Sequence, residues 1–108
     1  MTKVIVIQES RFNYSSAEQF GDIIFATSLE YSHVPSSQIN GRIISDIRKA
    51  FSDYIAGEDY IIPTGSPALC ALVMASLGAK YPNAAHNVLK WDNMSHSYQL
   101  YREIENIL

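Results

Sequence analysis

Short apolar runs recur along the chain and are separated by polar loops or by longer stretches of helical period. These runs cover residues 4–7, 22–27, 60–62 and 88–91. The runs at 4–7 and 22–27 are typical of strands buried on both faces, and those at 60–62 and 88–91 predict two further strands. We therefore expect a mostly parallel sheet with helices on either side of it.

A long helix is predicted in the middle of the chain. Ser36 or Ser37 precedes it as an N-cap, and the pattern continues to about Ile55 before Gly57. Its apolar positions recur every three or four residues and define one core-facing stripe: Ile39, Ile43, Ile47, Ala50, Phe51 and Tyr54.

A second helix is predicted from Pro67 to about Tyr81. Ser66 directly before Pro67 is a typical helix start, and Pro82 ends the pattern. Because this segment is apolar nearly all round, we expect it to be buried, against the sheet on one side and a partner subunit on the other.

Two shorter features complete the expected fold. Ser15 and Glu18 fit a capping box for a helical turn over residues 16–20, which Gly21 stops. Residues 92–95 resemble a turn, and the alternation that follows predicts a returning edge strand: Tyr98, Leu100, Arg102 and Ile104. The fold class is therefore α/β: one domain over residues 1–108, a small Rossmann-like sandwich of four to five mostly parallel strands, two main helices and a C-terminal hairpin.

Composition excludes several classes of protein. The 108 residues are 47% hydrophobic and include only four Pro and five Gly, which argues against disorder and low complexity. A net charge of −3 disfavours binding to DNA or RNA polymers, which usually requires a basic excess. Cys70 is the only cysteine, so we expect a buried thiol and no disulfide. Because no apolar segment approaches the ~20 residues that cross a bilayer, we expect no membrane association and a cytoplasmic location.

Two loops carry the candidate chemistry. In open α/β sheets, ligands bind beyond the carboxyl ends of the parallel strands, where residues 8–15 and 64–67 are expected to lie. An anionic ligand could be held by a guanidinium, aromatic rings and the amides of a helix N-terminus. The candidate ligand-binding residues are Gln8, Ser10, Arg11, Phe12, Asn13, Tyr14, Thr64, Gly65, Ser66 and Trp91. The Thr-Gly-Ser-Pro turn is also a common strand-to-helix joint without any ligand.

Motifs for other chemistry are absent from the sequence. It contains neither a G-x-G-x-x-G nor a G-x-x-x-x-G-K-[ST] loop, and Ser66 has Ala68 where a nucleophile elbow has its second glycine. His86, Asp92 and His96 match no standard metal spacing and are expected to flank turns. We therefore expect no catalytic residues, no metal and no cofactor.

Three segments resemble a family of short bacteriophage proteins. They are the stretch from Phe12 to Gly21 (FNYSSAEQFG), the strand and turn from Asp59 to Leu69 (DYIIPTGSPAL), and Val88 to Asp92 (VLKWD). The similarity extends over about the whole chain, although Ser66 stands where many relatives have an acidic residue. In general layout such proteins resemble phage sponges that sequester nucleotide immune signals, as in Thoeris anti-defence.

This resemblance implies a phage protein that sequesters a cyclic oligonucleotide or an ADP-ribose derivative in the host cytoplasm. Two alternatives stay open. One is a module that acts on a host protein through an aromatic patch of Trp91, Tyr98 and Tyr101. The other is a nucleotide-degrading enzyme, which would require a general base near Ser66. Two exposed sheet edges and the apolar second helix also predict a homo-oligomer.

Overall fold

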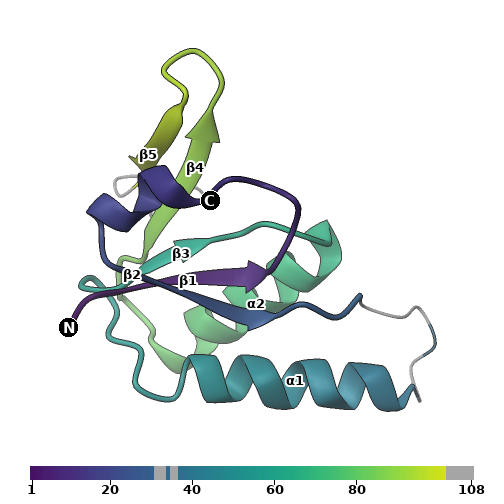
Figure 1. Ribbon diagram of the computed structural model, residues 1–108. Helices are drawn as coiled ribbons and strands as arrows, with labels where there is room; N and C mark the ends of the chain where they lie inside the picture. Colours follow the sequence, from purple (N-terminus) through teal and green to yellow (C-terminus); the bar gives the residue numbers. More distant parts are fainter. Residues whose placement is uncertain (31–33, 35–36, 102–108) are drawn as a thin grey trace.

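Five strands form one sheet in the order β2-β1-β3-β4-β5 (Figure 1). The computed structural model describes residues 1–30, 34 and 37–101. The elements are β1 (Lys3–Gln8), the 3₁₀ helix η1 (Ser15–Gln19), β2 (Asp22–Thr27), α1 (Gln38–Ala50), β3 (Tyr60–Ile62), α2 (Pro67–Lys80), β4 (Asn87–Asp92) and β5 (Ser97–Tyr101).

The sheet is mixed rather than mostly parallel. β1 pairs in parallel with β2 and β3, and β3 pairs in parallel with β4, whereas β4 and β5 form an antiparallel hairpin. The structure is thus a mixed α/β fold with two helices, and the expected Rossmann-like sandwich is met only in part. None of the described helices is long and apolar enough to span a bilayer.

Both long helices cover the same face of the sheet, which corrects the expectation of helices on either side (Figure 1). Ile5, Ile7 and Ile61 point to this face and pack with α1 and α2. Val4 and Val6 point to the opposite face, where η1 and the β4–β5 hairpin cover them.

The strand order explains this distribution. From β1 to β2 the chain moves in one direction along the sheet, and from β2 through β3 to β4 it moves in the other. Crossover connections between parallel strands are almost always right-handed. Two such connections that run in opposite directions along the sheet therefore lie on opposite faces of it. The connection that contains η1 therefore lies on one face, and those that contain α1 and α2 lie on the other.

The first helix begins where expected and ends earlier. The Ser37 side chain accepts a hydrogen bond from the Ile39 N–H, while the alternative cap, Ser36, lies outside the described residues. Helix α1 ends at Ala50, not near Ile55, because the backbone leaves the helical conformation at Phe51. The predicted stripe is buried at Ile43, Phe51 and Tyr54, but Ile39 is half exposed.

Within the single chain, the second helix is buried on one face, and contact of its other face with a partner subunit stays a prediction. Ser66 caps it as predicted, and Leu69, Cys70, Val73 and Leu77 are buried against the sheet. Its other face is exposed, including Leu72 at 55%. An apolar sequence can leave one face of a helix exposed when most residues on that face are small, as the alanines are here. Burial raises the pKa of the Cys70 thiol.

Three smaller predictions have different outcomes. The helical turn exists as η1, but Tyr14 is its N-cap residue and no side chain caps it, so the predicted capping box is wrong. β2 is an edge strand with Phe25 41% exposed, not a strand buried on both faces. The hairpin turn is confirmed, since the Asp92 carboxylate accepts hydrogen bonds from the Met94 and Ser95 N–H groups. Arg102 and Ile104 lie outside the described residues.

Candidate functional site

A hollow of about 580 Å³ lies beyond the carboxyl ends of β1 and β3. Between these two strands the connections diverge, because β1 leads to β2 on one side and β3 leads to β4 on the other. Such a switch in direction is where open α/β sheets bind ligands. Six predicted site residues line the hollow: Gln8, Ser10, Arg11, Phe12, Gly65 and Ser66. Glu9, Ser28 and Glu30 also line it and were not predicted.

Gln8 joins three segments and holds the hollow in shape. Its side chain is buried, and its Oε1 accepts a hydrogen bond of 2.6 Å from the Ser66 N–H. Its Nε2 donates to the Leu29 carbonyl, and its backbone N–H donates to the Thr64 carbonyl at 3.1 Å. Because its amide is already bonded at both ends, Gln8 positions the two loops and has little left to offer a ligand.

Glycine is required at position 65. Its φ of +111° lies in the region that side chains rarely adopt, and a Cβ there would approach the Gln8 Cβ to 2.4 Å. A residue without a Cβ allows another group to approach the backbone closely. In the structure it is the Gln8 side chain that makes this approach.

The N-terminus of α2 is largely satisfied by the chain itself. Gln8 binds the Ser66 N–H, Pro67 has no N–H, and the Ser66 Oγ accepts from the Leu69 N–H at 3.4 Å. This leaves the Ala68 N–H as the first-turn donor without a partner among the described residues. A ligand can therefore gain little from the helix end alone.

Arg11 and Phe12 have exposed side chains at the hollow. Both lie on the loop after β1, and the Phe12 side chain is 66% exposed. The Ser10 N–H donates to the Tyr14 hydroxyl at 3.2 Å, which ties the loop back to η1. Glu9 and Glu30 bring two carboxylates to the same hollow, so its charge is not uniformly positive.

The remaining predicted residues do not line the hollow. The Asn13 Oδ1 accepts from the Ser15 N–H. Tyr14 is buried between Phe25 and Tyr98, so its ring is packed rather than free to stack on a ligand. Thr64 serves through its backbone carbonyl, which binds Gln8.

Trp91 lies on the hairpin, away from the hollow. Its ring contacts Tyr98 edge-on at 5.4 Å, and its Nε1 donates to the Asn93 side chain at 3.0 Å. It is 37% exposed. Within the described part of the chain, Trp91 is one end of an aromatic row across the η1 face that continues through Tyr98 and Tyr14 to Phe25.

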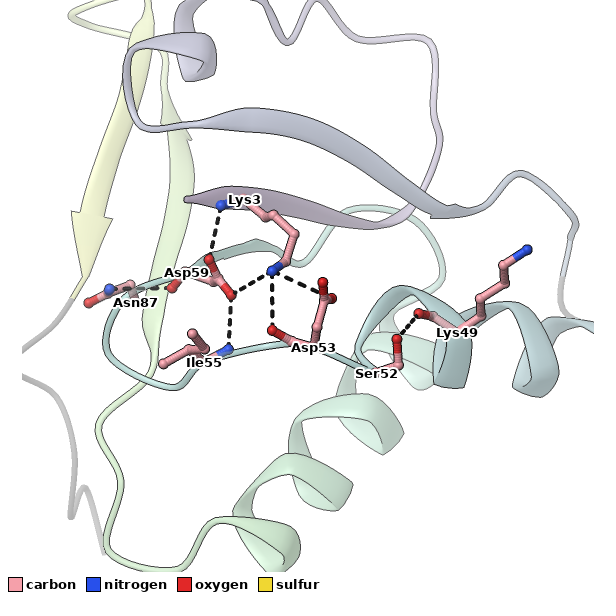
Figure 2. Close-up of polar contacts among 7 residues, drawn as sticks. All are labelled: Lys3, Lys49, Ser52, Asp53, Ile55, Asp59 and Asn87. Atoms are coloured by element: carbon pink, nitrogen blue, oxygen red, sulfur yellow. Dashed lines mark hydrogen bonds and ion pairs between the residues drawn. The ribbon is translucent and has the colours of Figure 1, made fainter. Parts of the chain in front are cut away.

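Sequence reasoning missed a polar network at the other end of the strands (Figure 2). Asp59 is 1% exposed, and its carboxylate accepts from the Lys3 and Ile55 N–H groups, each at 2.9 Å. The Lys3 ammonium lies 3.3 Å from Asp59 and 3.5 Å from Asp53. Burial alone would raise the pKa of Asp59, but these hydrogen bonds and the charge of Lys3 outweigh it and lower that pKa.

A half-buried histidine lies on the same side of the sheet as α1. His86 stacks on Tyr54, whose hydroxyl lies 2.5 Å from the His86 Nδ1, and burial lowers the pKa of His86. The described residues contain no group of three His, Cys, Asp or Glu side chains placed to hold a metal ion. Of the three histidines in the sequence, His33 lies outside the described residues.

Comparison with known proteins identifies a family. Neither curated proteins nor solved structures give a significant match to this chain. The comparisons therefore do not support the resemblance to sponges of immune signals. The family described as phage Pam3 gp32-like protein, however, matches residues 2–104, which is nearly the whole sequence. The chain belongs to this family of phage proteins.

Proposed function

We propose that this phage protein binds an anionic, nucleotide-like ligand in the hollow beyond β1 and β3 and sequesters it, in the cytoplasm of the infected cell, against a host defence. The observation that carries the proposal is the placement of Arg11 and Phe12, an exposed cation and an exposed ring on one loop, at the rim of this hollow. A cyclic oligonucleotide or an ADP-ribose derivative has the matching groups.

Each group of the hollow has a distinct role in this proposal. The Arg11 guanidinium pairs with a phosphate in two-point geometry, and the Phe12 ring stacks on a base. Glu9 and Glu30 accept hydrogen bonds from ribose hydroxyls, as acidic residues do in dinucleotide sites. Gln8 holds the two loops in register and does not contact the ligand.

Binding without turnover is favoured by the state of Ser66. Its hydroxyl oxygen already accepts a hydrogen bond from the Leu69 N–H as the cap of α2. A nucleophilic serine requires an adjacent base that takes its proton. The described lining of the hollow contains no histidine, and neither of its carboxylates, Glu9 and Glu30, is hydrogen-bonded to the Ser66 hydroxyl.

Calorimetry against cyclic dinucleotides, cyclic trinucleotides and ADP-ribose isomers tests the proposal. We expect heat with one class and its loss in Arg11→Ala, while Arg42→Ala, on the exposed side of α1, binds as the parent does. After heat denaturation of the complex the signal should be recovered intact. No heat with any compound overturns the proposal, and recovery of a cleaved product shows an enzyme instead.

A second candidate function is a module that acts on a host protein. It is favoured by apolar side chains that stay exposed on and beside the hairpin, namely Trp91, Met94 and Tyr101. Tyr98, also expected in this patch, is buried. Substituting Trp91 and Met94 by Ser should abolish protection of the phage under this alternative and leave it unchanged if Arg11 and the hollow are responsible.

We also propose that the protein self-associates. Both ends of the described sheet, β2 and β5, are edge strands, and unpaired edges favour pairing with a further chain.

A further inference from the structure

The free edge of β2 lacks the features that usually prevent an edge strand from pairing with another chain. Its sequence, DIIFAT, has one charge at its start, no proline and a β-branched or aromatic centre. Natural edge strands are usually blunted by lysines, prolines, bulges or a covering segment. Beside this edge, a groove of about 690 Å³ opens between β2 and α1. We infer that the edge is an interface, and that its occupant is β2 of a second copy of this chain, antiparallel about a two-fold axis.

The backbone of β2 defines one register for such pairing. The Asp22 N–H donates to the Thr2 carbonyl at 3.0 Å, so Asp22 presents its backbone to β1. Because successive residues of a strand present their backbone groups to alternate sides, Ile23 and Phe25 present theirs to the free edge. A two-fold axis at Ile24 pairs Ile23 of each copy with Phe25 of the other, and each such pair exchanges two hydrogen bonds.

The side chains suit this register. Phe25 and Ile23 lie on the η1 face, where Phe25 is 41% exposed and contacts Tyr14 edge-on. Across the axis, Phe25 of one copy would lie opposite Ile23 of the other, and aromatic–β-branched pairs stabilise antiparallel strands. On the α1 face, Ile24 would meet its own copy. The pairing therefore covers the exposed ring and joins two five-stranded sheets into one.

Charge on the groove also favours a second copy. Its α1 side carries Asp46 and Lys49 one turn apart, and beyond the end of α1 it is lined by Asp53, which pairs with Lys3 at 3.5 Å. Because the groove carries both signs of charge, a second copy brings the same mixture to the interface, and no block of a single sign forms there. A strongly acidic or basic partner lacks this match. The inference rests on the proposed self-association and names its surface.

Sedimentation over a range of micromolar concentrations tests the inference with a matched pair of variants, Phe25→Pro and Phe25→Ala. Both lose the ring, but only proline also removes the outward N–H, which an edge strand tolerates in the monomer. We expect a dimer for the parent, and a dissociation constant at least about tenfold higher for Phe25→Pro than for Phe25→Ala, because one backbone bond per copy is lost.

Lys49→Asp, with Lys49→Ala as its control, provides an independent test if Phe25→Pro does not fold. The aspartate leaves only acidic charge on the α1 side of the groove and should weaken the dimer more than alanine does, most strongly at low salt. A monomeric parent overturns both self-association and this interface. A dimer that neither Phe25→Pro nor Lys49→Asp weakens overturns the interface alone, and ligand binding at Arg11 is measured separately in every case.

Discussion

Two polar regions lie at opposite ends of β1 and β3 and differ in almost every physical respect. At the amino ends, Lys3 and Asp59 form a closed network in which the carboxylate is buried and bonded to two N–H groups and an ammonium. At the carboxyl ends, Arg11 and Phe12 are exposed at the rim of a hollow. The same two strands therefore end in a satisfied cluster on one side and in available groups on the other.

This difference separates structural from functional polar residues. A buried charge must be paired, so the free energy of its interactions goes into maintaining the fold. An exposed cation beside a hollow contributes little to the fold and can bind a ligand instead. Gln8 stands between these cases, since it lies in the functional region but its bonds to Ser66 and Leu29 are structural. Substitutions at the two ends should therefore act on different measurements.

The largest effect is expected from Asp59→Ala at the amino ends. It leaves the Lys3 and Ile55 N–H groups without their acceptor and the Lys3 ammonium with Asp53 alone, and breaking a buried pair in this way costs about 4 kcal/mol. Urea unfolding measures the loss. Asp53→Ala is the control, because that side chain is 76% exposed and its pair with Lys3 should contribute below about 1 kcal/mol. Equal losses for the two variants would contradict the assignment of Asp59 as the centre of the network.

Gly65→Ala should have the next largest effect, at the carboxyl ends. The new Cβ meets Gln8 and must displace it from Ser66 and Leu29, in addition to the strain of a positive φ. We expect a loss of about 3 kcal/mol in the free energy of unfolding.

Gly57→Ala separates strain from collision. Gly57 has a φ of +84°, but a Cβ there has only the Ala85 carbonyl within reach, at 3.9 Å. Its cost should be about 1 kcal/mol. If Gly65→Ala is no worse than Gly57→Ala in urea unfolding, Gln8 is not the residue that requires glycine.

Acid should weaken the amino-end network through Asp59, whose pKa is lowered in the folded state from its ordinary 3.8. The unfolded chain then binds the proton more tightly than the folded one, so the contribution of Asp59 is complete above the ordinary pKa. It is lost as the pH falls from about 5 through the lowered value. Unfolding free energies measured from neutral to acid pH should decrease more steeply for the parent than for Asp59→Asn. Parallel curves would contradict the role of this carboxylate.

The sequence predicted what depends on local pattern. Ser66 was identified as an N-cap, and Ser37 as one of two candidates with Ser36, because the cap is chosen within a few residues. The hairpin turn at Asp92 was found for the same reason. The two loops around Arg11 and Gly65 were expected at one edge because parallel strands share their carboxyl ends.

What the sequence could not predict depends on which strands are neighbours. The placement of Tyr14 in the core follows from its contacts with Phe25 and Tyr98, which come from β2 and β5. Asp59 could pair with Lys3 only because β1 and β3 are adjacent and begin at the same edge. Strand order also made β2 an edge and placed both helices on one face, and no local pattern specifies it.

The smallest effect on stability is expected from Arg11→Ala, and it is the variant that tests the comparison most directly. Arg11 is exposed, and exposed substitutions of this kind usually change the free energy of unfolding by less than about 0.5 kcal/mol. A charge-assisted contact to phosphate contributes about 1.5–3 kcal/mol, so the same variant should weaken ligand binding by roughly ten- to a hundredfold. On one preparation, urea unfolding measures the change in the free energy of unfolding, and calorimetry measures the change in affinity for the ligand. Asp59→Ala should show the reverse pattern at temperatures where it is still folded: unfolding at lower urea with unchanged affinity. If Arg11→Ala instead destabilises the fold and leaves binding intact, the guanidinium belongs with the structural residues, and the carboxyl ends of β1 and β3 differ from the amino ends only in exposure.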